Sequence, residues 1–173
     1  DERYRLCQEV ILGLAGVAML TARVYDAIGM THMNEGHSAL ATLALLEEQS
    51  RSSPEREFSE VEIEAVRHRC VFTTHTPVPA GHDRFNAELV YRILGNGRAT
   101  ALAQMQLLDG CLNMTELALR LSGFVNAVSM RHRDISRAMF PNHNIQAITN
   151  GVHATTWTSA SFASLYDRFV PGW

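Results

Sequence analysis

The sequence predicts an α/β fold in which helices cover a mostly parallel sheet. Stretches with helical apolar spacing alternate along the chain with short strand-like apolar runs, and this alternation is typical of βαβ units. Polar residues cluster directly after several of those runs. Because ligands of such sheets bind beyond the carboxyl ends of the strands, the pattern also predicts a shared site at that edge. With 173 residues, 46% of them hydrophobic, the chain is long enough to bury the core of one domain.

The charges and cysteines exclude several classes of protein. The 15 basic and 18 acidic residues are interspersed, so no nucleic acid is expected as a partner. The apolar stretch 10–20 is short and interrupted by glycine, so no membrane is expected either. Three widely spaced cysteines fit the reducing cytoplasm. Every basic residue is an arginine, and without a lysine no carbonyl cofactor can form a Schiff base with this chain.

The first half of the chain predicts three helices and two strands. In chain order we expect a helix at 2–24, a strand at 27–32, a helix at 38–48, a polar loop at 51–56, a helix at 59–69 and a strand at 70–73. Ser59 with Glu62 three residues later is the sequence of a capping box. Gly13 and Gly16 lie inside the first helix, where we expect them to permit close packing.

The second half predicts more helices than strands. In chain order we expect a loop at 74–84, helices at 86–94, 99–108 and 115–122, a strand at 124–128, a short helix at 132–139, a strand at 145–149 and a helix at 159–169. Asn86 is expected to cap its helix, and Gly95-Asn96-Gly97 to close it. The stretch 82–85 would be either a histidine base with an orienting carboxylate or a salt-bridged loop leading to the Asn86 cap.

Two strand ends carry candidate ligand-binding side chains. His75 follows a buried strand and precedes Pro77 and Pro79, which stiffen its loop. Its ring offers a ligand one donor and one acceptor, although a loop histidine that bonds its own backbone would look the same. Asn150 precedes Gly151 after the last expected strand. An amide there can bind two hydroxyls of a sugar, and the alternative is an ordinary Asn-Gly turn.

A third polar cluster consists of Asn34, Glu35 and His37. Gly36 is expected to let the chain turn into the next helix, whose free N–H groups favour an anion or a polar ligand. The alternative is that Asn34 or Glu35 simply caps that helix. Glu35 and His37, together with His32 and His75, would form the site of a metal-dependent hydrolase, but the spacing H-x-x-E-x-H matches neither zinc-protease motif.

Long strings of the sequence resemble the short bacterial and archaeal α-glucan phosphorylases. The strings are His32 to Ala39, Val71 to Phe85, and Ile148 to His153 leading to Thr156-Trp157. The stretch Leu117 to Phe140 is similar to the family segment between the last two. Order and spacing agree as well, so the resemblance covers nearly the whole chain.

The resemblance implies a fold and an activity. These phosphorylases are GT-B-like glycosyltransferases with two Rossmann-like domains facing across a cleft. They cleave a terminal α-1,4-linked glucose from a glucan or maltodextrin with phosphate and release α-glucose 1-phosphate. Pyridoxal phosphate is held by a lysine of their second domain. By this resemblance, residues 1–157 are the later part of the first domain, and 158–173 are a crossover helix towards the second.

The resemblance also assigns roles to individual residues. His75 corresponds to the catalytic-site histidine whose side chain binds the glucose 6-hydroxyl and whose carbonyl lies near the anomeric carbon. Asn150 corresponds to the asparagine that hydrogen-bonds glucose hydroxyls. Asn34, Glu35 and His37 correspond to a polar motif that lines the cleft.

The family parts that hold cofactor and phosphate are not found in these 173 residues. Both ends look like cuts through a longer protein, so we expect the isolated chain to be inactive and, with apolar surface exposed, to self-associate. A metal-dependent hydrolase and a non-catalytic carbohydrate-binding domain remain as alternatives.

Overall fold

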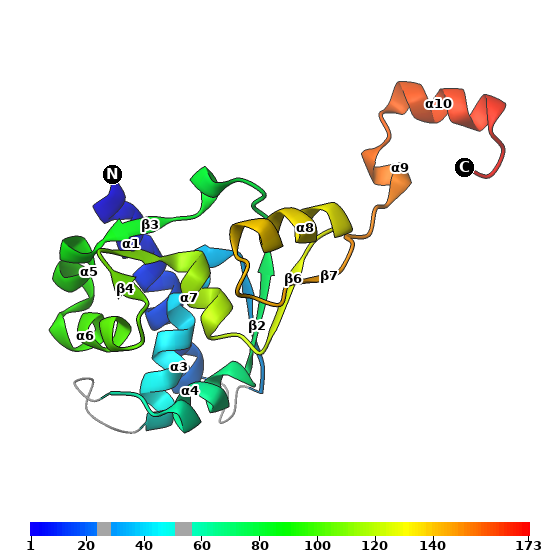
Figure 1. Ribbon diagram of the computed structural model, residues 1–173. Coiled ribbons are helices and arrows are strands. Elements are labelled where there is room, and N and C mark those ends of the chain that lie inside the picture. The colour runs from blue at the N-terminus through cyan, green and yellow to red at the C-terminus, as the bar shows by residue number, and fades with distance from the viewer. Residues whose placement is uncertain (24–28, 51–56) are drawn as a thin grey trace.

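The structure is a computed structural model that describes residues 1–23, 29–50 and 57–173. Its centre is a four-stranded sheet of β1 (Thr31–Asn34), β2 (Cys70–Thr74), β6 (Phe124–Ala127) and β7 (Gln146–Ala147), in that order (Figure 1). All three strand pairs are parallel. Each connection between neighbouring strands contains at least one helix. The predicted α/β class with a parallel sheet is therefore confirmed.

Most predicted helices are present. The helical elements are α1 (Glu2–Val10), the π-helical turn η1 (Ile11–Ala15), α2 (Gly16–Arg23), the 3-10 turns η2 (Gly36–Ser38) and η3 (Pro79–Gly81), α3 (Leu40–Ser50), α4 (Glu60–Arg67), α5 (Ala87–Leu94), α6 (Asn96–Gln104), α7 (Met114–Arg120), α8 (Met130–Met139), α9 (Ala154–Trp157) and α10 (Ala160–Phe169). The capping box is formed, because the Glu62 N–H donates to Ser59 Oγ and the Ser59 N–H donates to Glu62 Oε2. Asn86 caps α5 by accepting from the Leu89 N–H.

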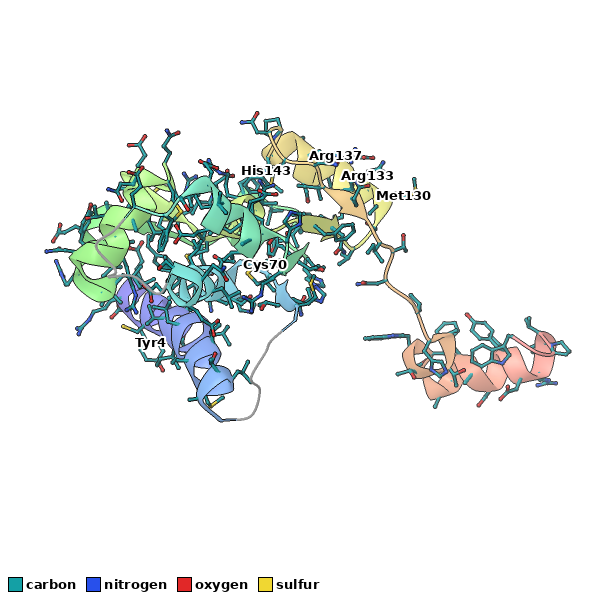
Figure 2. The ribbon with its side chains drawn as sticks, turned by 90° about the horizontal axis from the view of Figure 1, so that it is seen from below. Tyr4, Cys70, Met130, Arg133, Arg137 and His143 are labelled. Atoms are coloured by element: carbon teal, nitrogen blue, oxygen red, sulfur yellow. The ribbon has the colours of Figure 1, made fainter. Side chains whose placement is uncertain are left out.

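One face of the parallel sheet is packed into the core. Met33 lies opposite Phe72, and Phe72 lies opposite Val125. All three are buried, and they share one apolar cluster with the leucines of α3 and α7. On the last two strands, α8 packs against β6 and β7. Arg137 of α8 donates to the Ile145 carbonyl at 2.7 Å, which holds the chain entering β7 (Figure 2).

A second, antiparallel sheet was not predicted. It consists of β3 (Arg84–Asn86), β5 (Cys111–Asn113) and β4 (Leu108–Asp109), in that order. These strands are too short to show alternation, and the helix expected at 99–108 ends at Gln104 instead. This sheet buries Phe85 opposite Leu112 and so anchors the far end of the 74–84 loop.

Some predicted boundaries are wrong. β1 begins at Thr31 and ends at Asn34, so it lies later than the strand expected at 27–32, whose residues 27 and 28 are outside the described residues. The pairing with β2 decides this, because His32 and Asn34 continue the parallel ladder. The polar loop expected at 51–56 also lies outside the described residues. Gly95 closes α5 as predicted, with a φ of 81° and its N–H donating to the Tyr91 carbonyl at 3.1 Å, but Asn96 and Gly97 already belong to α6.

The C-terminal segment stands apart from the rest. After β7 the chain leaves the body and forms α9 and α10, which extend away from it in both views (Figure 1, Figure 2). Neither helix has a buried residue. Trp157, Phe162 and Phe169 are among the exposed large apolar side chains of this arm.

The N-terminal helical run is continuous from Glu2 to Arg23 despite its two glycines. The helix formed by residues 2–22 is long and apolar enough to cross a membrane, and it is the one such helix among the described residues. The expectation that the apolar stretch is too short and too interrupted by glycine for this was therefore wrong. Leu6, Leu14 and Val17 are nevertheless buried in the core, and a core helix passes the same test of length and composition.

The two glycines of this run have different surroundings. A Cβ at Gly13 would lie 2.7 Å from the Leu40 Cβ and from the Ala41 nitrogen, whereas a Cβ at Gly16 would meet nothing within 4 Å. Gly13 therefore permits close packing, as predicted, and Gly16 does not.

We predict opposite effects of adding a methyl group at these two positions. Gly13→Ala forces α3 away and lowers the free energy of unfolding by roughly 1–3 kcal/mol. Gly16→Ala raises it by about 0.5–1 kcal/mol, because alanine favours the helix and has room. Urea denaturation of the two variants checks this, and equal effects would contradict the packing of η1 on α3.

Candidate functional site

The candidate site lies where β1 and β2 end side by side. Asn34 is the last residue of β1 and Thr74 the last of β2, so Glu35 and His75 follow at the same carboxyl edge. Glu35 Oε2 accepts hydrogen bonds from the His75 N–H at 2.7 Å and from Thr76 Oγ1 at 2.9 Å. Asn34 Oδ1 lies 2.5 Å from His75 Nε2. Three of the five predicted site residues are thus in direct contact.

The contact with Asn34 favours one tautomer of the His75 ring. A carbonyl oxygen can only accept, so the tautomer that fits is the one with a hydrogen on Nε2, which donates a hydrogen bond to Asn34 Oδ1. In the neutral ring, Nδ1 is then left as an acceptor. The His75 side chain is exposed, and it can therefore receive a hydrogen bond from a hydroxyl group of a ligand.

Glu35 has an unusual backbone conformation. Its φ is 79° and its ψ 163°, a region that is essentially restricted to glycine and costs a non-glycine residue about 1–3 kcal/mol. The main chain keeps it there, since the Glu35 N–H donates to the Thr73 carbonyl at 2.9 Å. Glu35 also caps η2 by accepting from the Gly36 N–H at 3.2 Å, so the capping alternative is correct for this residue.

Gly36 does not make the turn that was predicted for it. The positive φ belongs to Glu35, and Gly36 begins the helical turn η2. A glycine is needed there because of packing, since a Cβ at Gly36 would lie 2.9 Å from Thr115 Oγ1 and 3.2 Å from the Thr115 nitrogen. The close approach of η2 to α7 therefore requires glycine at position 36.

The other two predicted residues lie at the same edge but apart from this cluster. His37 is half-buried in η2 and lies near enough to Asp83 for their charges to interact. Asn150 is exposed three residues beyond β7, and its N–H donates to the Val128 carbonyl at 3.1 Å. Among the described residues, no side-chain hydrogen bond joins either residue to the Asn34–Glu35–His75 cluster.

A polar ladder crosses three strands beside the site. Thr73 Oγ1 donates to Asn126 Oδ1 at 2.9 Å and accepts from His32 Nε2 at 2.8 Å. Its signal in the sequence is Asn126, an asparagine inside a buried strand. His32, a member of the candidate metal cluster, is hydrogen-bonded to Thr73 in this ladder. Within residues 1–23, 29–50 and 57–173, no group of three or more histidine, cysteine or acidic side chains could hold a metal ion.

Charged residues anchor the far end of the His75 loop. Arg5 of α1 donates to Asp83 Oδ2 from Nη2 at 2.7 Å and from Nε at 3.2 Å. The Asp83 carbonyl accepts from the Met114 N–H at 3.0 Å. Together with the Asn86 cap, this confirms the salt-bridged-loop interpretation of 82–85. The loop is therefore held at both ends.

Glu9 is a buried acidic residue beside Arg5 and Asp83 in this anchor. Glu9 is 1% exposed, and neither of its oxygens accepts a hydrogen bond, although Arg5 Nε lies 3.1 Å from Oε1. Burial, reinforced by the neighbouring Asp83, raises the pKa of Glu9 to about 8. For Asp83 burial acts in the same direction, but hydrogen bonds from Arg5 and Glu9 outweigh it and lower its pKa. With a pKa of about 8, the buried Glu9 carboxyl is mainly protonated at neutral pH, next to Asp83, whose pKa is lowered.

The sequence of this chain is similar to those of known phosphorylases. The glycogen phosphorylase of Mycobacterium tuberculosis (strain H37Rv) is 35% identical over 194 residues, which cover 95% of this chain and 22% of the relative. The maltodextrin phosphorylase of Thermococcus litoralis is 33% identical over 96% of this chain and 21% of its own length. Over nearly its whole length the chain is similar to one segment of these two phosphorylases. The resemblance of the sequence strings is thereby confirmed.

A third phosphorylase is similar at lower identity, and in every case the similarity covers only a limited part of the relative. The glycogen phosphorylase of Aquifex aeolicus is 28% identical over 98% of this chain and 26% of its own length. The chain thus spans between about a fifth and a quarter of the length of these phosphorylases. No protein-family model matches the chain.

We predict that Glu9→Gln removes a pH dependence of stability. The pKa of Glu9 is about 8 in the folded state against an ordinary value of 4.5, so the stability gained from its proton is complete below pH 4.5 and is lost as the pH rises through 8. The amide of glutamine cannot ionise. At pH 9 the variant should be more stable than the wild type by on the order of 1–3 kcal/mol.

Urea denaturation at pH 5, 7 and 9 measures this difference. Glu88→Gln, at an exposed position of α5, is the matched control and should follow the wild type at every pH. A wild-type stability that rises between pH 7 and 9 would contradict the protonated state of Glu9.

Proposed function

We propose that the chain is part of an α-1,4-glucan phosphorylase. In the reaction, the bond between the terminal glucose C1 and the glycosidic oxygen breaks, and a bond from C1 to a phosphate oxygen forms. The observation that carries the proposal is the cluster of His75, Asn34 and Glu35 at the carboxyl edge of the sheet, in a chain similar over 95% of its length to named phosphorylases.

His75 would make the central sugar contacts. Its free Nδ1 is an acceptor suited to the 6-hydroxyl of the terminal glucose. Its carbonyl would lie near the anomeric carbon, where a partial negative charge stabilises the positive charge that develops as the glycosidic bond breaks. Asn150, whose amide offers both donor and acceptor, would bind further hydroxyls from the end of β7, and His37 would line the cleft.

The described residues would supply the sugar-binding half of such a site. Residues 1–157 would belong to the first of two Rossmann-like domains, and 158–173 would cross towards the second. Pyridoxal phosphate does not fit this chain as a covalent cofactor, because no lysine amine is present. If the complete enzyme uses that cofactor, residues outside these 173 hold it, together with the phosphate substrate.

The surroundings of the protein follow from the same proposal. The complete enzyme would act on a glucan and phosphate, and it would be located in the cytoplasm. Self-association of the isolated chain is supported by large apolar side chains that are exposed on the arm and on the N-terminal helical run, such as Trp157 at 80% and Ile11 at 67%.

We predict that His75→Ala abolishes most phosphorolysis by the complete protein. The variant keeps the backbone carbonyl but loses the ring that would hold the 6-hydroxyl, and misplacement of the terminal glucose by this loss lowers kcat/KM by roughly 10²-fold. The measurement is phosphate-dependent release of glucose 1-phosphate from a maltodextrin. His68→Ala is the matched control, because His68 is exposed and lies before β2, at the opposite edge of the sheet, and it should retain full activity.

The outcome of that assay separates the proposal from its alternatives. A folded wild-type protein that binds maltodextrin without turnover would be a carbohydrate-binding protein. Activity in His75→Ala equal to that of the wild type would contradict the role of His75.

We also predict that the purified 173-residue chain releases no glucose 1-phosphate. It lacks the lysine that covalent cofactor attachment requires. The same assay, with the complete protein as the positive control, checks this. Turnover by the chain alone would overturn the assignment of these residues to half of a site.

A further inference from the structure

We infer that Glu35 is a positioning residue that holds His75 in place and does not itself bind the sugar. The inference rests on the proposed function, because it concerns how the same site is built. In this inference the Glu35 carboxylate forms its hydrogen bonds with other groups of the protein and not with the ligand. The sequence resemblance, in contrast, placed Glu35 among the residues that line the cleft.

The carboxylate of Glu35 is fully engaged by four donors. Oε1 accepts from the Gly36 N–H at 3.2 Å and lies 3.4 Å from the Thr74 hydroxyl. Oε2 accepts from the His75 N–H at 2.7 Å and from the Thr76 hydroxyl at 2.9 Å. An ionised carboxylate offers about four acceptor positions. Little capacity is therefore left for a sugar hydroxyl.

Three of the donors come from consecutive residues of one segment, Thr74, His75 and Thr76. The His75 N–H and the Thr76 hydroxyl flank the peptide unit that carries the His75 carbonyl. Fixing both sides of this unit fixes the direction of that carbonyl. Hydrogen bonds to an ionised acceptor are roughly twice as strong as those between neutral groups, so this constraint is a firm one.

The backbone at Glu35 points to the same role. Its φ of 79° and ψ of 163° suit glycine, and glycine would adopt them without strain. Glutamate brings strain to this position and adds one thing that glycine lacks, the carboxylate on the His75 segment. Strained residues that the surrounding structure holds in this way cluster at functional sites.

The geometry makes Glu35→Gly an informative variant. It removes all four side-chain contacts and relieves the backbone strain at the same time. The fold is therefore expected to survive, with a Tm within about 5 °C of that of the wild type, because the two effects oppose each other. If Glu35 had only a structural role, a retained Tm would come with retained activity.

The experiment uses the complete protein and two readouts. The first is kcat and KM for maltodextrin phosphorolysis, for which we expect kcat to fall about 100-fold and KM to change less than about 3-fold, as for an interaction that matters in the transition state. The second is hydrogen exchange of a peptide covering residues 74–78 without ligand. We expect exchange of the His75 amide to become at least about 10-fold faster, since it loses its acceptor.

Two further variants and a control sharpen the test. Thr76→Val keeps Glu35 and its backbone but removes one donor, so smaller changes in the same direction are expected in both readouts, even if Glu35→Gly does not fold. Glu35→Gln keeps the shape but presents its NH₂ group to donors, and it should lie between Glu35→Gly and the wild type. Glu88→Gln, exposed on α5, should change neither readout.

Failure of the inference and failure of the proposed function give different results. A wild-type protein without turnover contradicts the proposed function, and exchange of the His75 amide still decides whether Glu35 positions His75. Unchanged exchange in folded Glu35→Gly overturns the inference, whatever the activity. Faster exchange with wild-type kcat also overturns it, because positioning would then have no effect on the reaction.

Discussion

The parallel pairing of β1 with β2 is the constraint on which the site depends. Because Asn34 lies opposite Thr73 in this register, the residues that follow the two strands emerge side by side. A shift by one residue would turn Met33 and Phe72 out of the core, and it would also separate Glu35 from the His75 segment. The buried face of the sheet thus sets the register, and the register brings the polar residues together.

The loop between Thr74 and Arg84 extends this order beyond the sheet. Glu35 holds its first residues, and Arg5 with the small antiparallel sheet holds its last ones. Between them, Pro77 and Pro79 limit the backbone. A site built in this way needs little rearrangement to present His75 to a ligand, which reduces the cost of ordering it on binding.

Local sequence patterns predicted those features that depend on local physics. Apolar periodicity located most helices, the buried strand β2, and the cluster at its end. Features set by distant neighbours could not be predicted. Glycine is required at position 36 because Thr115 leaves no room for a Cβ there, and strands β3 to β5 exist because they pair with one another. The raised pKa of Glu9 depends in part on Asp83, which lies in a loop far along the chain from α1. The two-domain assignment came from family resemblance, and no periodicity in these residues would have suggested it.

The anchor of the His75 loop on α1 has a consequence for the order of folding. Arg5 and Asp83 are separated by 78 positions in the chain. The Asp83 carbonyl also accepts a hydrogen bond from the N–H of Met114, another residue distant in sequence. Closing such long loops costs entropy before any contact is gained, so contacts of this kind form slowly compared with helices. The helices and the β1–β2 pair can form early, while the loop that carries His75 reaches its final geometry only after α1, β3 and β5 have met. The edge that carries His75 is accordingly expected to be one of the last parts of the fold to assemble.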